Sequence, residues 1–278
     1  MKLGQLTIVT PTLNSANTIR GTLESLRPLV EEGAQHIVVD SGSTDGTMEI
    51  ARQFGSEVVY HPPGNMYAAI NAGMEKARGE WLTYINSDDL LFADYVVEAL
   101  EIVSNGVDVI YGDIDFIDDQ GRFLFSRRAP DPYHLSWLMR YYNPFPQQGA
   151  LFKREAFDRV GGFNTQFRFA SDLDFFVRCM LGGERFYKFR GKSVAAFRLL
   201  PSQLSQSSRI EMAPEGIEIR KKLREEFNTI PNWVGRPLAG FYRVSSNLDS
   251  IFLRWLRGRQ QDAAWRSGNS NSPGREKP

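Results

Sequence analysis

The sequence predicts an α/β domain built on a Rossmann-like, mainly parallel sheet flanked by helices, with a helical extension at the C-terminus. Three observations lead to this prediction. Short runs rich in β-branched residues alternate four times with helical patterns in the first part of the chain. Polar clusters follow three of those runs. From Asp108 the alternation gives way to longer strand-like runs and loops, which indicates a mixed portion beside the parallel one.

Each of the four units combines a short strand with a helix. The strand-like runs are "LTIVT", "HIVVD", "EVVYH" and "WLTYI", and helical patterns follow from about Ser15, from about Thr47, in "MYAAINAGMEKA" and in "LFADYVVEALEIV". Repeated βα units imply parallel strands with helices on both faces. Ligands of such sheets bind at the carboxyl ends of the strands. The clusters "TPTLN", "DSGSTDGT" and "NSDD" all fall there, so we expect three loops distant in sequence to meet along one edge.

The second portion is expected to complete a cleft beside this nucleotide-type half. Its strand-like runs "VDVIYGDIDFI" and "RFLFSR" flank the turn "DDQG", and "QGALFKREAF" and the helical "SDLDFFVRCML" come next. We predict one domain over residues 1–205, a helical extension over 206–260, and a tail over 261–278. The tail is polar and rich in Gly, Pro and Ser, so we expect it to be disordered.

Composition argues against several classes of function. The chain carries 33 basic and 33 acidic side chains, so no overall field would attract nucleic acid. The single cysteine, Cys179, lies in the apolar run "FFVRCML" and is expected to be a buried small residue. No window approaches the roughly 20 apolar residues of a membrane-spanning helix. We therefore expect a cytoplasmic protein, either soluble or peripheral on a membrane.

The loop after the second strand is a candidate binding site. Asp40 ends that strand and precedes "SGSTDGT", whose small residues open a helix. Backbone N–H groups and the helix dipole at such a position favour an anion or a polar base. For Asp45 we favour a turn or N-cap role over ligand contact. Asp40 stands where capping does not obviously require an acid, so we favour a functional role for it.

Two adjacent acids, Asp88 and Asp89, follow the fourth strand. One interpretation is a solvated loop pair in which Asp89 or Ser87 caps the next helix. The other is a site for a hard divalent cation, Mg²⁺ or Mn²⁺, which would offset both carboxylates and keep positions for substrate phosphates. The three histidines are scattered and lack the spacing of zinc ligands.

A further pair of acids, Asp172 and Asp174, stands at the start of the predicted helix in "FASDLDFFVR". Capping by Ser171 or Asp172 explains one of these polar residues. The alternative is a division of tasks, in which one acidic pair holds a metal and another carboxylate acts as a general base.

Two other enzyme classes are disfavoured. Asp113 and Asp115 in "YGDIDF" are similar to the paired aspartates of haloacid-dehalogenase-type phosphatases, but those follow an early strand, and here four βα units precede the pair. Ile117 also stands where that family usually has Thr or Val. No GxGxxG follows a strand, which argues against a dinucleotide-dependent oxidoreductase.

Four motifs taken in order resemble glycosyltransferase family 2, the sugar-nucleotide-dependent transferases of the GT-A fold. They are "IVTPTLNSANTIRGTLESL", "IVVDSGSTDGT", "MYAAINAGMEKARGEWLTYINSDD" and "FASDLDFFVR". The resemblance runs from about Leu6 to about Leu204. It implies an inverting transferase that moves a sugar from a nucleotide-diphosphate sugar, usually UDP-linked, to a hydroxyl of a glycan or lipid-linked acceptor with Mg²⁺ or Mn²⁺. No Gln-x-x-Arg-Trp follows "SDLD", so the resemblance to processive synthases is poor and we expect a non-processive enzyme.

The resemblance also implies a nucleotide and donor site at the strand ends. Asp40 would hydrogen-bond the base, Asn71 would lie near the diphosphate, and Asp88 would approach the ribose or the donor sugar. The full set that it places in this site is Pro11, Thr12, Asn14, Asp40, Ser41, Gly42, Asn71 and Asp88.

The remaining implied roles concern the metal, the base and the acceptor. Asp89 would ligate the metal, and Asp172 matches the acid that serves as base. Gln148, in "PQQGALF", and Asp174 would lie on the acceptor side. In the implied single displacement, Asp172 takes the proton of an acceptor hydroxyl, and the metal at Asp89 stabilises the departing nucleoside diphosphate.

The sequence departs from the family pattern before the acidic strand. Related members read "D-K-G-x-Y-D-A-x-N-K-G" where this chain reads "P-G-N-M-Y-A-A-I-N-A-G". Pro63 and Ala68 therefore replace acids, and Ala72 replaces a lysine. These losses keep open a second hypothesis, a sugar-nucleotide-binding protein with weak or no catalysis.

Two C-terminal segments carry further expectations. In "RLLPSQLSQSSR", Arg198 or Arg209 could screen a diphosphate, although an ordinary surface connection is favoured. The segment from Phe241 to Trp255 has apolar residues at helical spacing and a basic flank. Packing of its apolar face on the domain is favoured over peripheral contact with an anionic membrane.

Overall fold

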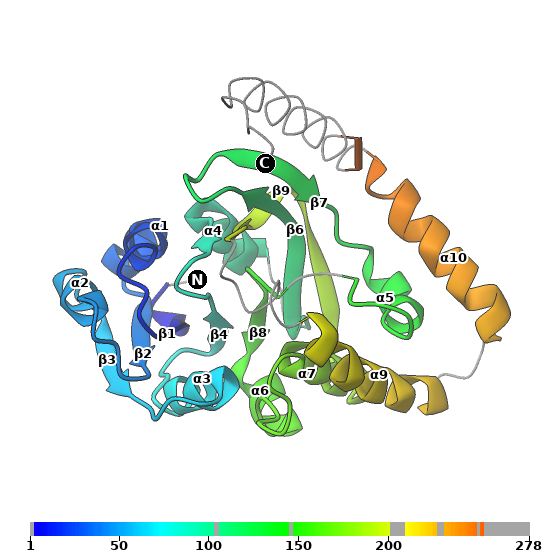
Figure 1. Ribbon diagram of the computed structural model, residues 1–278, viewed down its shortest axis with the longest axis horizontal. Coiled ribbons are helices and arrows are strands. Elements are labelled where there is room, and N and C mark those ends of the chain that lie inside the picture. Colours follow the sequence, from blue (N-terminus) through cyan, green and yellow to red (C-terminus); the bar gives the residue numbers. More distant parts are fainter. Residues whose placement is uncertain are drawn as a thin grey trace, which may run out of the picture.

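The structure, a computed structural model, describes residues 3–102, 106–144, 147–200, 209–226, 231–248 and 251–252. A nine-stranded sheet passes through the molecule in the order β3-β2-β1-β4-β8-β6-β9-β5, and β7 pairs with β6. Helices cover both faces of this curled sheet (Figure 1).

The first half contains the predicted parallel strands. After a 3₁₀ turn (η1, Leu3–Gln5), its elements are β1 (Leu6–Thr12), α1 (Ile19–Glu31), β2 (Gln35–Asp40), α2 (Thr47–Gln53), β3 (Glu57–Tyr60), α3 (Met66–Glu75), β4 (Trp81–Tyr84), β5 (Leu90–Leu91) and α4 (Ala93–Ile102). Strand β1 runs parallel to β2 and to β4, and β2 runs parallel to β3. The prediction of a parallel sheet from four βα units is confirmed.

The second half is mixed, as predicted. Its elements are β6 (Val109–Ile117), β7 (Phe123–Arg127), α5 (Pro132–Leu138), β8 (Leu151–Lys153), α6 (Arg154–Val160), α7 (Ser171–Leu181) and β9 (Phe186–Arg198). Strand β8 joins the two halves, since it pairs antiparallel with both β4 and β6. The predicted turn "DDQG" connects β6 to β7, which form an antiparallel pair.

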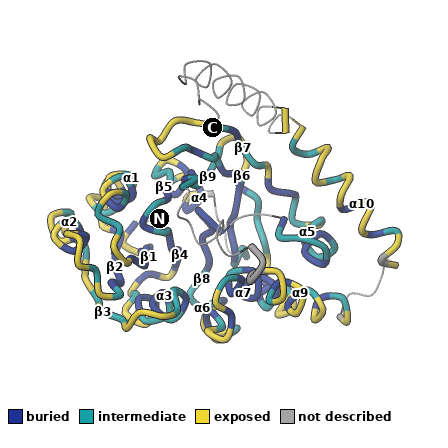
Figure 2. The backbone as a smooth tube through the Cα atoms, in the orientation of Figure 1, coloured by how far each residue is buried: buried dark blue, intermediate teal, exposed yellow. Residues whose placement is uncertain are grey.

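The sheet separates two apolar cores. Side chains alternate between the faces of a strand, so Val9 and Leu82 pack with α3 and α7, whereas Ile8 and Trp81 pack with α1 and α4. The central strands are buried, and exposed residues lie mainly on the outer helices and loops (Figure 2). Because both faces are covered, polar groups that serve function in this half are confined to the strand ends and loops. Cys179 is buried in the first of these cores, as predicted.

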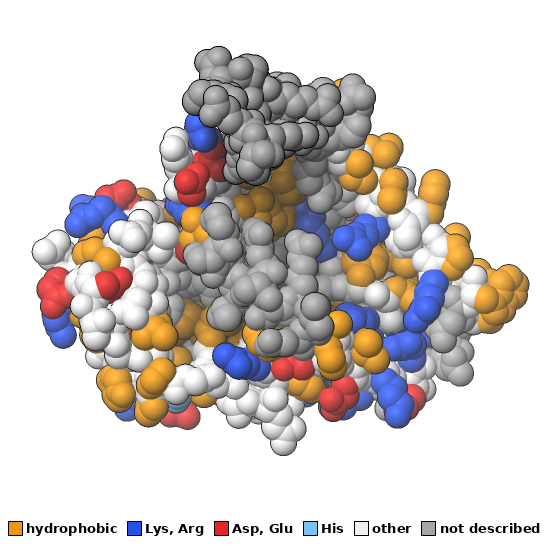
Figure 3. All heavy atoms as spheres, viewed as in Figure 1, with side chains coloured by type: hydrophobic (Ala, Val, Ile, Leu, Met, Phe, Trp, Pro, Cys, Tyr) orange, Lys and Arg blue, Asp and Glu red, His pale blue; other side chains and the backbone are white. Residues whose placement is uncertain are grey.

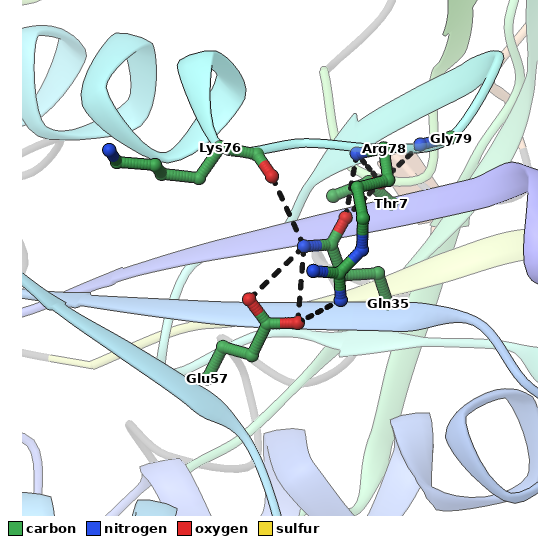
Figure 4. Close-up of polar contacts among 6 residues, drawn as sticks. All are labelled: Thr7, Gln35, Glu57, Lys76, Arg78 and Gly79. Carbon is green, nitrogen blue, oxygen red and sulfur yellow. Dashed lines mark hydrogen bonds and ion pairs between the residues drawn. The ribbon is translucent and has the colours of Figure 1, made fainter.

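The amino ends of the parallel strands carry a polar network centred on the Gln35 amide (Figure 4). Its oxygen accepts from the Thr7 hydroxyl at 2.9 Å and from the Arg78 N–H at 2.7 Å. Its nitrogen donates to the Glu57 carboxylate and to the Lys76 carbonyl, each at 3.2 Å. The network therefore ties together β1, β2, β3 and the segment that enters β4.

The first helix of the C-terminal extension, α9 (Arg209–Glu226), shares the core of the preceding domain. Its Ile219 and Leu223 are fully buried and belong to the same apolar cluster as Leu173 and Phe176 of α7. The helix thus packs against the second half of the sheet domain. The predicted tail lies outside the described residues.

The next helix, α10 (Asn232–Ser245), contacts α5 through one face. The Tyr242 ring lies 4.9 Å from the His134 ring, centroid to centroid, and Ala239 is buried. The predicted apolar stripe faces away. Its described members are between 38% and 73% exposed, namely Phe241, Val244, Leu248, Ile251 and Phe252. The prediction that this stripe packs on the domain is wrong, because the face with the small Ala239 makes the close approach. Trp255 lies outside the described residues.

None of the helices within the described ranges has the length and the apolar character that crossing a bilayer requires.

Candidate active site

Three loops meet at the carboxyl edge of the parallel strands, as the sequence predicts. They follow β1, β2 and β4. The Asn14 side-chain oxygen accepts from the Thr44 N–H at 2.9 Å, which joins the first loop to the second. The Ser87 hydroxyl donates to the Ser15 hydroxyl at 2.8 Å, which joins the third loop to the first. Asn14 has φ 51°, in the left-handed region that asparagine tolerates better than most residues.

Asp40 organises the loop in which it stands. It pairs with Thr12 at the ends of β2 and β1, and its carboxylate accepts from the N–H groups of Gly42 and Ser43, each at 3.1 Å. Gly42 has φ +94°, a conformation that strains other residues. The sequence indicates no capping reason for this acid, and the structure supplies one. Contact between Asp40 and a base stays a prediction.

The end of β1 lies beside this loop. Pro11 and Thr12 are both buried, and Pro11 lies beyond Val9, the last residue of β1 that pairs with β4. A proline is tolerated there because no N–H is needed on that side. The Ser41 N–H donates to the Thr12 carbonyl at 3.0 Å. The Thr12 hydroxyl is buried and has no hydrogen-bond partner among the described residues.

Asp45 has the turn role that the sequence favours. Its carboxylate accepts from the Thr47 N–H at 3.1 Å and from the Ala16 N–H at 3.0 Å. The hydrogen bond from the Thr47 hydroxyl has the largest effect on the pKa of Asp45 and lowers it, and the hydrogen bond from the Ala16 N–H lowers it further. The residue therefore fixes the start of α2 and links it to the loop after β1.

Asp89 is a buried carboxylate held by nitrogen donors. One oxygen accepts from the Arg198 N–H at 3.0 Å, and the other accepts from the side-chain amides of Gln148 at 3.1 Å and Asn86 at 3.4 Å. Burial, and then the adjacent charge of Asp88, raise the pKa of Asp89 well above its ordinary value. These donors therefore compensate the charge of Asp89 only in part.

Asp88 is the more exposed member of the pair. It is half-buried, whereas Asp89 has no exposed surface. The Asn86 side-chain oxygen is buried and has no partner in the part of the chain described. Carboxylate and amide oxygens suit a hard divalent cation, and Mg²⁺ commonly uses one or two carboxylates plus phosphates. The residues present therefore fit a divalent cation that also binds a substrate diphosphate.

Gln148 positions Asp89. It precedes β8, so its hydrogen bond to Asp89 spans the joint between the two halves of the sheet. The side chain is buried, which leaves little of it for a sugar to contact in this conformation. Its predicted place on the acceptor side stays a prediction.

Asp172 stands at the start of α7 with a raised pKa. Its Oδ1 accepts from the Leu173 N–H at 2.8 Å and from the Tyr67 hydroxyl at 3.3 Å. Burial raises the pKa of Asp172 to about 6, although these hydrogen bonds act in the opposite direction. A carboxylate that titrates close to neutral pH is suited to accept a proton.

Tyr84 is a buried side chain that neighbours both Asp172 and Asp89. Burial raises the pKa of Tyr84 well above its ordinary value, and the neighbouring Tyr67, Asp172 and Asp89 raise it further. Tyr67, which contacts Asp172, and Tyr84, at the end of β4, both pack against the Phe163 ring, with ring centroids 5.7 Å and 5.2 Å away. The loop after β4 and the start of α7 therefore border a common site.

Asp174 is held in an ion pair within α7. It is buried, and its carboxylate accepts from the Arg178 Nε at 2.7 Å. Arg178 also donates to the Gly162 carbonyl at 2.8 Å. Residues two positions apart in a helix point in nearly opposite directions, so Asp174 faces away from Asp172. Its acceptor-side role stays a prediction, and these contacts favour a structural role instead.

Asn71 is engaged with backbone. Its amide nitrogen donates to the Phe163 carbonyl at 2.8 Å, and its amide oxygen accepts from the Phe163 N–H at 3.0 Å. This two-way contact fastens α3 to the loop that leads into α7. Its place near a diphosphate stays a prediction, and these contacts favour a structural role for the amide.

Arg198 stabilises the acidic loop through backbone carbonyls. The guanidinium donates to the carbonyls of Asp88 at 2.9 Å, Asp119 at 3.1 Å and Asp118 at 3.2 Å. The residue is buried, which disfavours the alternative that it screens a diphosphate. The side chain of Arg209 lies outside the described residues.

The acids of β6 are engaged by neighbouring strands. Asp113 lies 3.0 Å from the Lys188 ammonium, and Asp115 accepts from the hydroxyls of Ser126 at 2.7 Å and Ser193 at 2.6 Å. Each carboxylate thus has a structural partner, and the phosphatase alternative has no support.

Two residues that contribute to the site escape the sequence analysis. Tyr67 contacts Asp172, and it stands within the quoted motif "MYAAINAGMEKA", so a signal is present in the sequence. Glu215 of α9 contacts the backbone just before Asp172. Nothing in the sequence links it to Asp172, because the two meet only through the packing of α9 on α7.

A parallel half with an acidic pair after β4, joined through β8 to a mixed half that carries Asp172, is the arrangement that the sequence motifs imply for a GT-A glycosyltransferase. A family model described as "Glycosyl transferase family 2" matches residues 7–173, more than half of the chain. The chain belongs to that family. The fold and the enzyme class that the sequence motifs imply are confirmed.

Curated relatives agree with this membership. A "PGL/p-HBAD biosynthesis glycosyltransferase" of Mycobacterium bovis is 28% identical over 197 residues, and the match covers 64% of this chain and 71% of the relative. An "Uncharacterized glycosyltransferase" of Mycobacterium tuberculosis is 27% identical over 183 residues, and the match covers 63% of this chain and 69% of the relative.

Solved structures share the fold. S. aureus TarS 1–349 in complex with UDP-GlcNAc has a TM-score of 0.59 at 16% identity, and the match covers 95% of this chain and 92% of the other. The chain spans 54% of the longer TarS chain. The mannosyltransferase PcManGT of Pyrobaculum calidifontis, in complex with GDP-Man and Mn²⁺, has a TM-score of 0.58 at 19% identity, and the match covers 97% of this chain and 76% of the other. At these identities the likeness concerns the fold.

Proposed function

We propose that the protein transfers a sugar from a nucleotide-diphosphate sugar, UDP-linked, to a hydroxyl of a glycan or glycolipid acceptor, with inversion at the anomeric carbon. The observation that carries this proposal is the packing of the start of α7 beside the end of β4: Tyr67, which donates to Asp172, and Tyr84, which ends the strand before the acidic loop, both contact the Phe163 ring. The similar structures support the donor class, because they were solved with UDP-GlcNAc and with GDP-Man and Mn²⁺.

In this proposal Asp172 is the general base. Its pKa of about 6 leaves it mostly ionised at neutral pH, yet basic enough to take a proton from an attacking hydroxyl. Tyr67 and the Leu173 N–H hold one carboxylate oxygen, so they orient the group. The acceptor oxygen then attacks the anomeric carbon as the bond to the nucleoside diphosphate breaks.

The donor nucleotide is assigned to the three strand-end loops. Asp40 would bind the base, with Ser41, Gly42 and Asn14 around it. The buried Thr12 hydroxyl, unpartnered among the described residues, supports a polar ligand at this edge. A buried hydroxyl usually has a hydrogen-bond partner, from protein, water or ligand.

A divalent cation, Mg²⁺ or Mn²⁺, would be held at the acidic pair, where it would neutralise charge on the leaving diphosphate. The family resemblance assigns the cation to Asp89 and gives Asp88 a ribose or sugar contact. The full burial of Asp89 and the donors on both of its oxygens favour a larger share for the more exposed Asp88. Separate variants of the two residues decide between these assignments.

Binding of nucleotide sugars provides the direct test of the whole proposal. A panel of sugar nucleotides is measured by thermal unfolding of the full chain, with and without Mn²⁺, and by product formation. A ligand at about 100 times its Kd stabilises the folded state by about 2.7 kcal/mol. The true donor should raise the melting temperature more with Mn²⁺ present. The proposal fails if no nucleotide sugar shifts the transition under either condition.

The second hypothesis, a sugar-nucleotide binder with weak catalysis, has a specific basis in Pro63, Ala68 and Ala72, which replace charged residues of the family pattern. It predicts the same thermal shift without turnover. Release of the nucleoside diphosphate in the presence of candidate acceptors would exclude it.

We also propose that α10 holds the protein on an anionic membrane surface, which would suit a lipid-linked acceptor. Its outer face exposes Trp233 at 81% and Phe241 at 73%. Figure 3 shows hydrophobic side chains along the edge that α10 forms. Residues 231–248 also contain Arg236 and Arg243 and no acidic side chain, so the charge of this segment complements anionic lipid.

Sedimentation with vesicles tests this surface. The full chain should sediment with vesicles of anionic phosphatidylglycerol and phosphatidylcholine, and much less with phosphatidylcholine alone. Trp233→Ser and Phe241→Ser should reduce sedimentation, whereas Tyr133→Ser, an exposed aromatic on α5, serves as control. Self-association of the chain without vesicle binding would assign the face to a second copy instead.

A further inference from the structure

Glu215 of α9 binds three consecutive backbone N–H groups. Its Oε1 accepts from the N–H of Arg168 at 2.8 Å, and its Oε2 accepts from the N–H groups of Phe169 and Ala170, each at 2.9 Å. A carboxylate that accepts several N–H groups makes charge-assisted hydrogen bonds, which are stronger than neutral ones. This one side chain therefore fixes the conformation of the whole segment.

The segment leads directly into α7 and Asp172. The first N–H groups of a helix have no partners within the helix, and Ala170, at the N-cap of α7, has no side chain able to cap it. A negative charge is favourable near this end of the helix. Glu215, on a different helix, supplies that charge at Ala170, the residue directly before Ser171 and Asp172.

A second contact connects the segment to the carboxylate itself. The Tyr67 hydroxyl lies 3.2 Å from the Phe169 carbonyl and 3.3 Å from Asp172 Oδ1. Glu215 holds the N–H of the same Phe169. A displacement of this backbone would therefore move both α7 and the tyrosine that orients Asp172.

The packing of α9 sets the position of Glu215. Ile219 and Leu223 follow it at intervals of four residues, so the three side chains lie along one face of the helix. Both apolar residues are fully buried in the cluster that contains Leu173 and Phe176 of α7. The carboxylate is thus delivered to the start of α7 by a helix that is anchored on α7 itself.

We propose that Glu215 is a positioning residue for Asp172, so that α9 completes the catalytic site from outside the part of the chain that matches the family model. That match ends at residue 173, within α7. This inference rests on the proposed function, in which Asp172 is the base. The contacts of Glu215 are with backbone N–H groups.

The charge of Glu215 provides a signature that a purely structural contact lacks. Burial has the largest effect on the pKa of Asp172 and raises it. The N–H of Leu173, the Tyr67 hydroxyl and the N–H of Asp172 itself lower this pKa, and the Glu215 carboxylate raises it. Tyr84 is the further titratable neighbour. Removal of the Glu215 charge should therefore lower the pKa of Asp172.

The test compares Glu215→Gln and Glu215→Asp with Glu218→Gln, a matched change at an exposed position of the same helix. Gln keeps the length and loses the charge, and Asp keeps the charge but is too short for all three N–H groups. Because a small misplacement of a catalytic group can cost about 100-fold in rate, kcat should fall about 10- to 100-fold in both Glu215 variants, with the donor KM unchanged. The acid limb of the kcat profile should move to lower pH in Glu215→Gln only.

Amide hydrogen exchange gives a readout that does not depend on activity. Exchange of the amides of residues 168–170 should become faster in both Glu215 variants and remain as in the wild type in Glu218→Gln. Unchanged exchange, or kcat values equal to the control, would overturn the inference. A wild-type chain that binds no nucleotide sugar would overturn the proposed function instead, while the exchange measurement still decides whether Glu215 holds the segment.

Discussion

Two polar clusters, one around Gln35 and one in the loops after β1 and β4, lie at opposite ends of the parallel strands and differ in how their groups are satisfied. At the amino end, the Gln35 amide bonds to side chains of β1 and β3 and to the Arg78 backbone. At the carboxyl end of the same strands, the buried Thr12 hydroxyl and Asn86 oxygen lack partners among the described residues. The pKa of Asp89 is raised there by burial and by Asp88. The first cluster is satisfied within the protein, which favours stability, whereas the second leaves buried polar atoms for the ligands proposed above.

The largest effect should come from Asp172→Asn. A general base contributes about 10²–10⁴-fold in rate, and asparagine cannot accept the proton, so kcat should fall by that factor. Binding of the donor should persist, because the nucleotide is assigned to the loops after β1 and β2. Initial rates and donor-induced thermal shifts measure the two properties. Near-normal turnover would refute the assignment of the base.

Variants of the acidic pair should reveal how the two carboxylates divide their tasks. Asp88→Asn and Asp89→Asn each should reduce turnover at least about tenfold, because each removes a charge that would stabilise the cation. The variant that removes the main ligand should also lose the Mn²⁺-dependent part of the donor-induced thermal shift. Gln53→Asn, an exposed change on α2, is the control. Equal Mn²⁺ responses in all three variants and the wild type would contradict a cation site here.

The pH dependence should follow from the pKa of Asp172, about 6 in the folded protein. The protonated carboxyl cannot act as a base, so kcat should rise with pH through about 6 and fall about tenfold per pH unit below it. The pKa of Asp172 is higher in the folded than in the unfolded protein, so between about pH 4 and pH 6 the folded state binds more protons than the unfolded state. The free energy of unfolding should therefore decrease as pH rises through that window. A kcat profile flat from pH 5 to 8 would contradict this role.

The smallest effect on activity should come from the amino end. Gln35→Ala removes the acceptor of the buried Thr7 hydroxyl proton, and an unsatisfied buried polar group costs about 1–3 kcal/mol. The free energy of unfolding should decrease by that amount while kcat stays within about twofold, since the network lies at the opposite end of the strands from the active site. Gln53→Ala, an exposed glutamine, is the matched control. Urea unfolding and initial rates provide the comparison, and a large loss of kcat at full stability would contradict the division between the two ends.

Sequence reasoning locates the strand-end loops correctly but cannot rank the acids and amides near them. Local chemistry alone predicts the turn role of Asp45, because its partner Thr47 lies two positions away. Motif position alone places Asp174 and Asn71 in the site, and the structure engages the first with Arg178 and the second with the Phe163 backbone. Motif position fixes where a residue lies along the chain, whereas the direction of its side chain depends on the packing around it.

Chain order was enough to establish the succession of βα units, the family, and the gathering of three polar loops at one edge. The reason is that successive parallel strands carry their carboxyl ends to the same side of the sheet. Three features came from the folded molecule alone: Asp89 is buried while Asp88 is partly exposed, the pKa of Asp172 is raised to about 6, and Glu215 reaches the start of α7. Burial and hydrogen-bond partners are supplied by elements distant in sequence, so they exist only once the chain is packed.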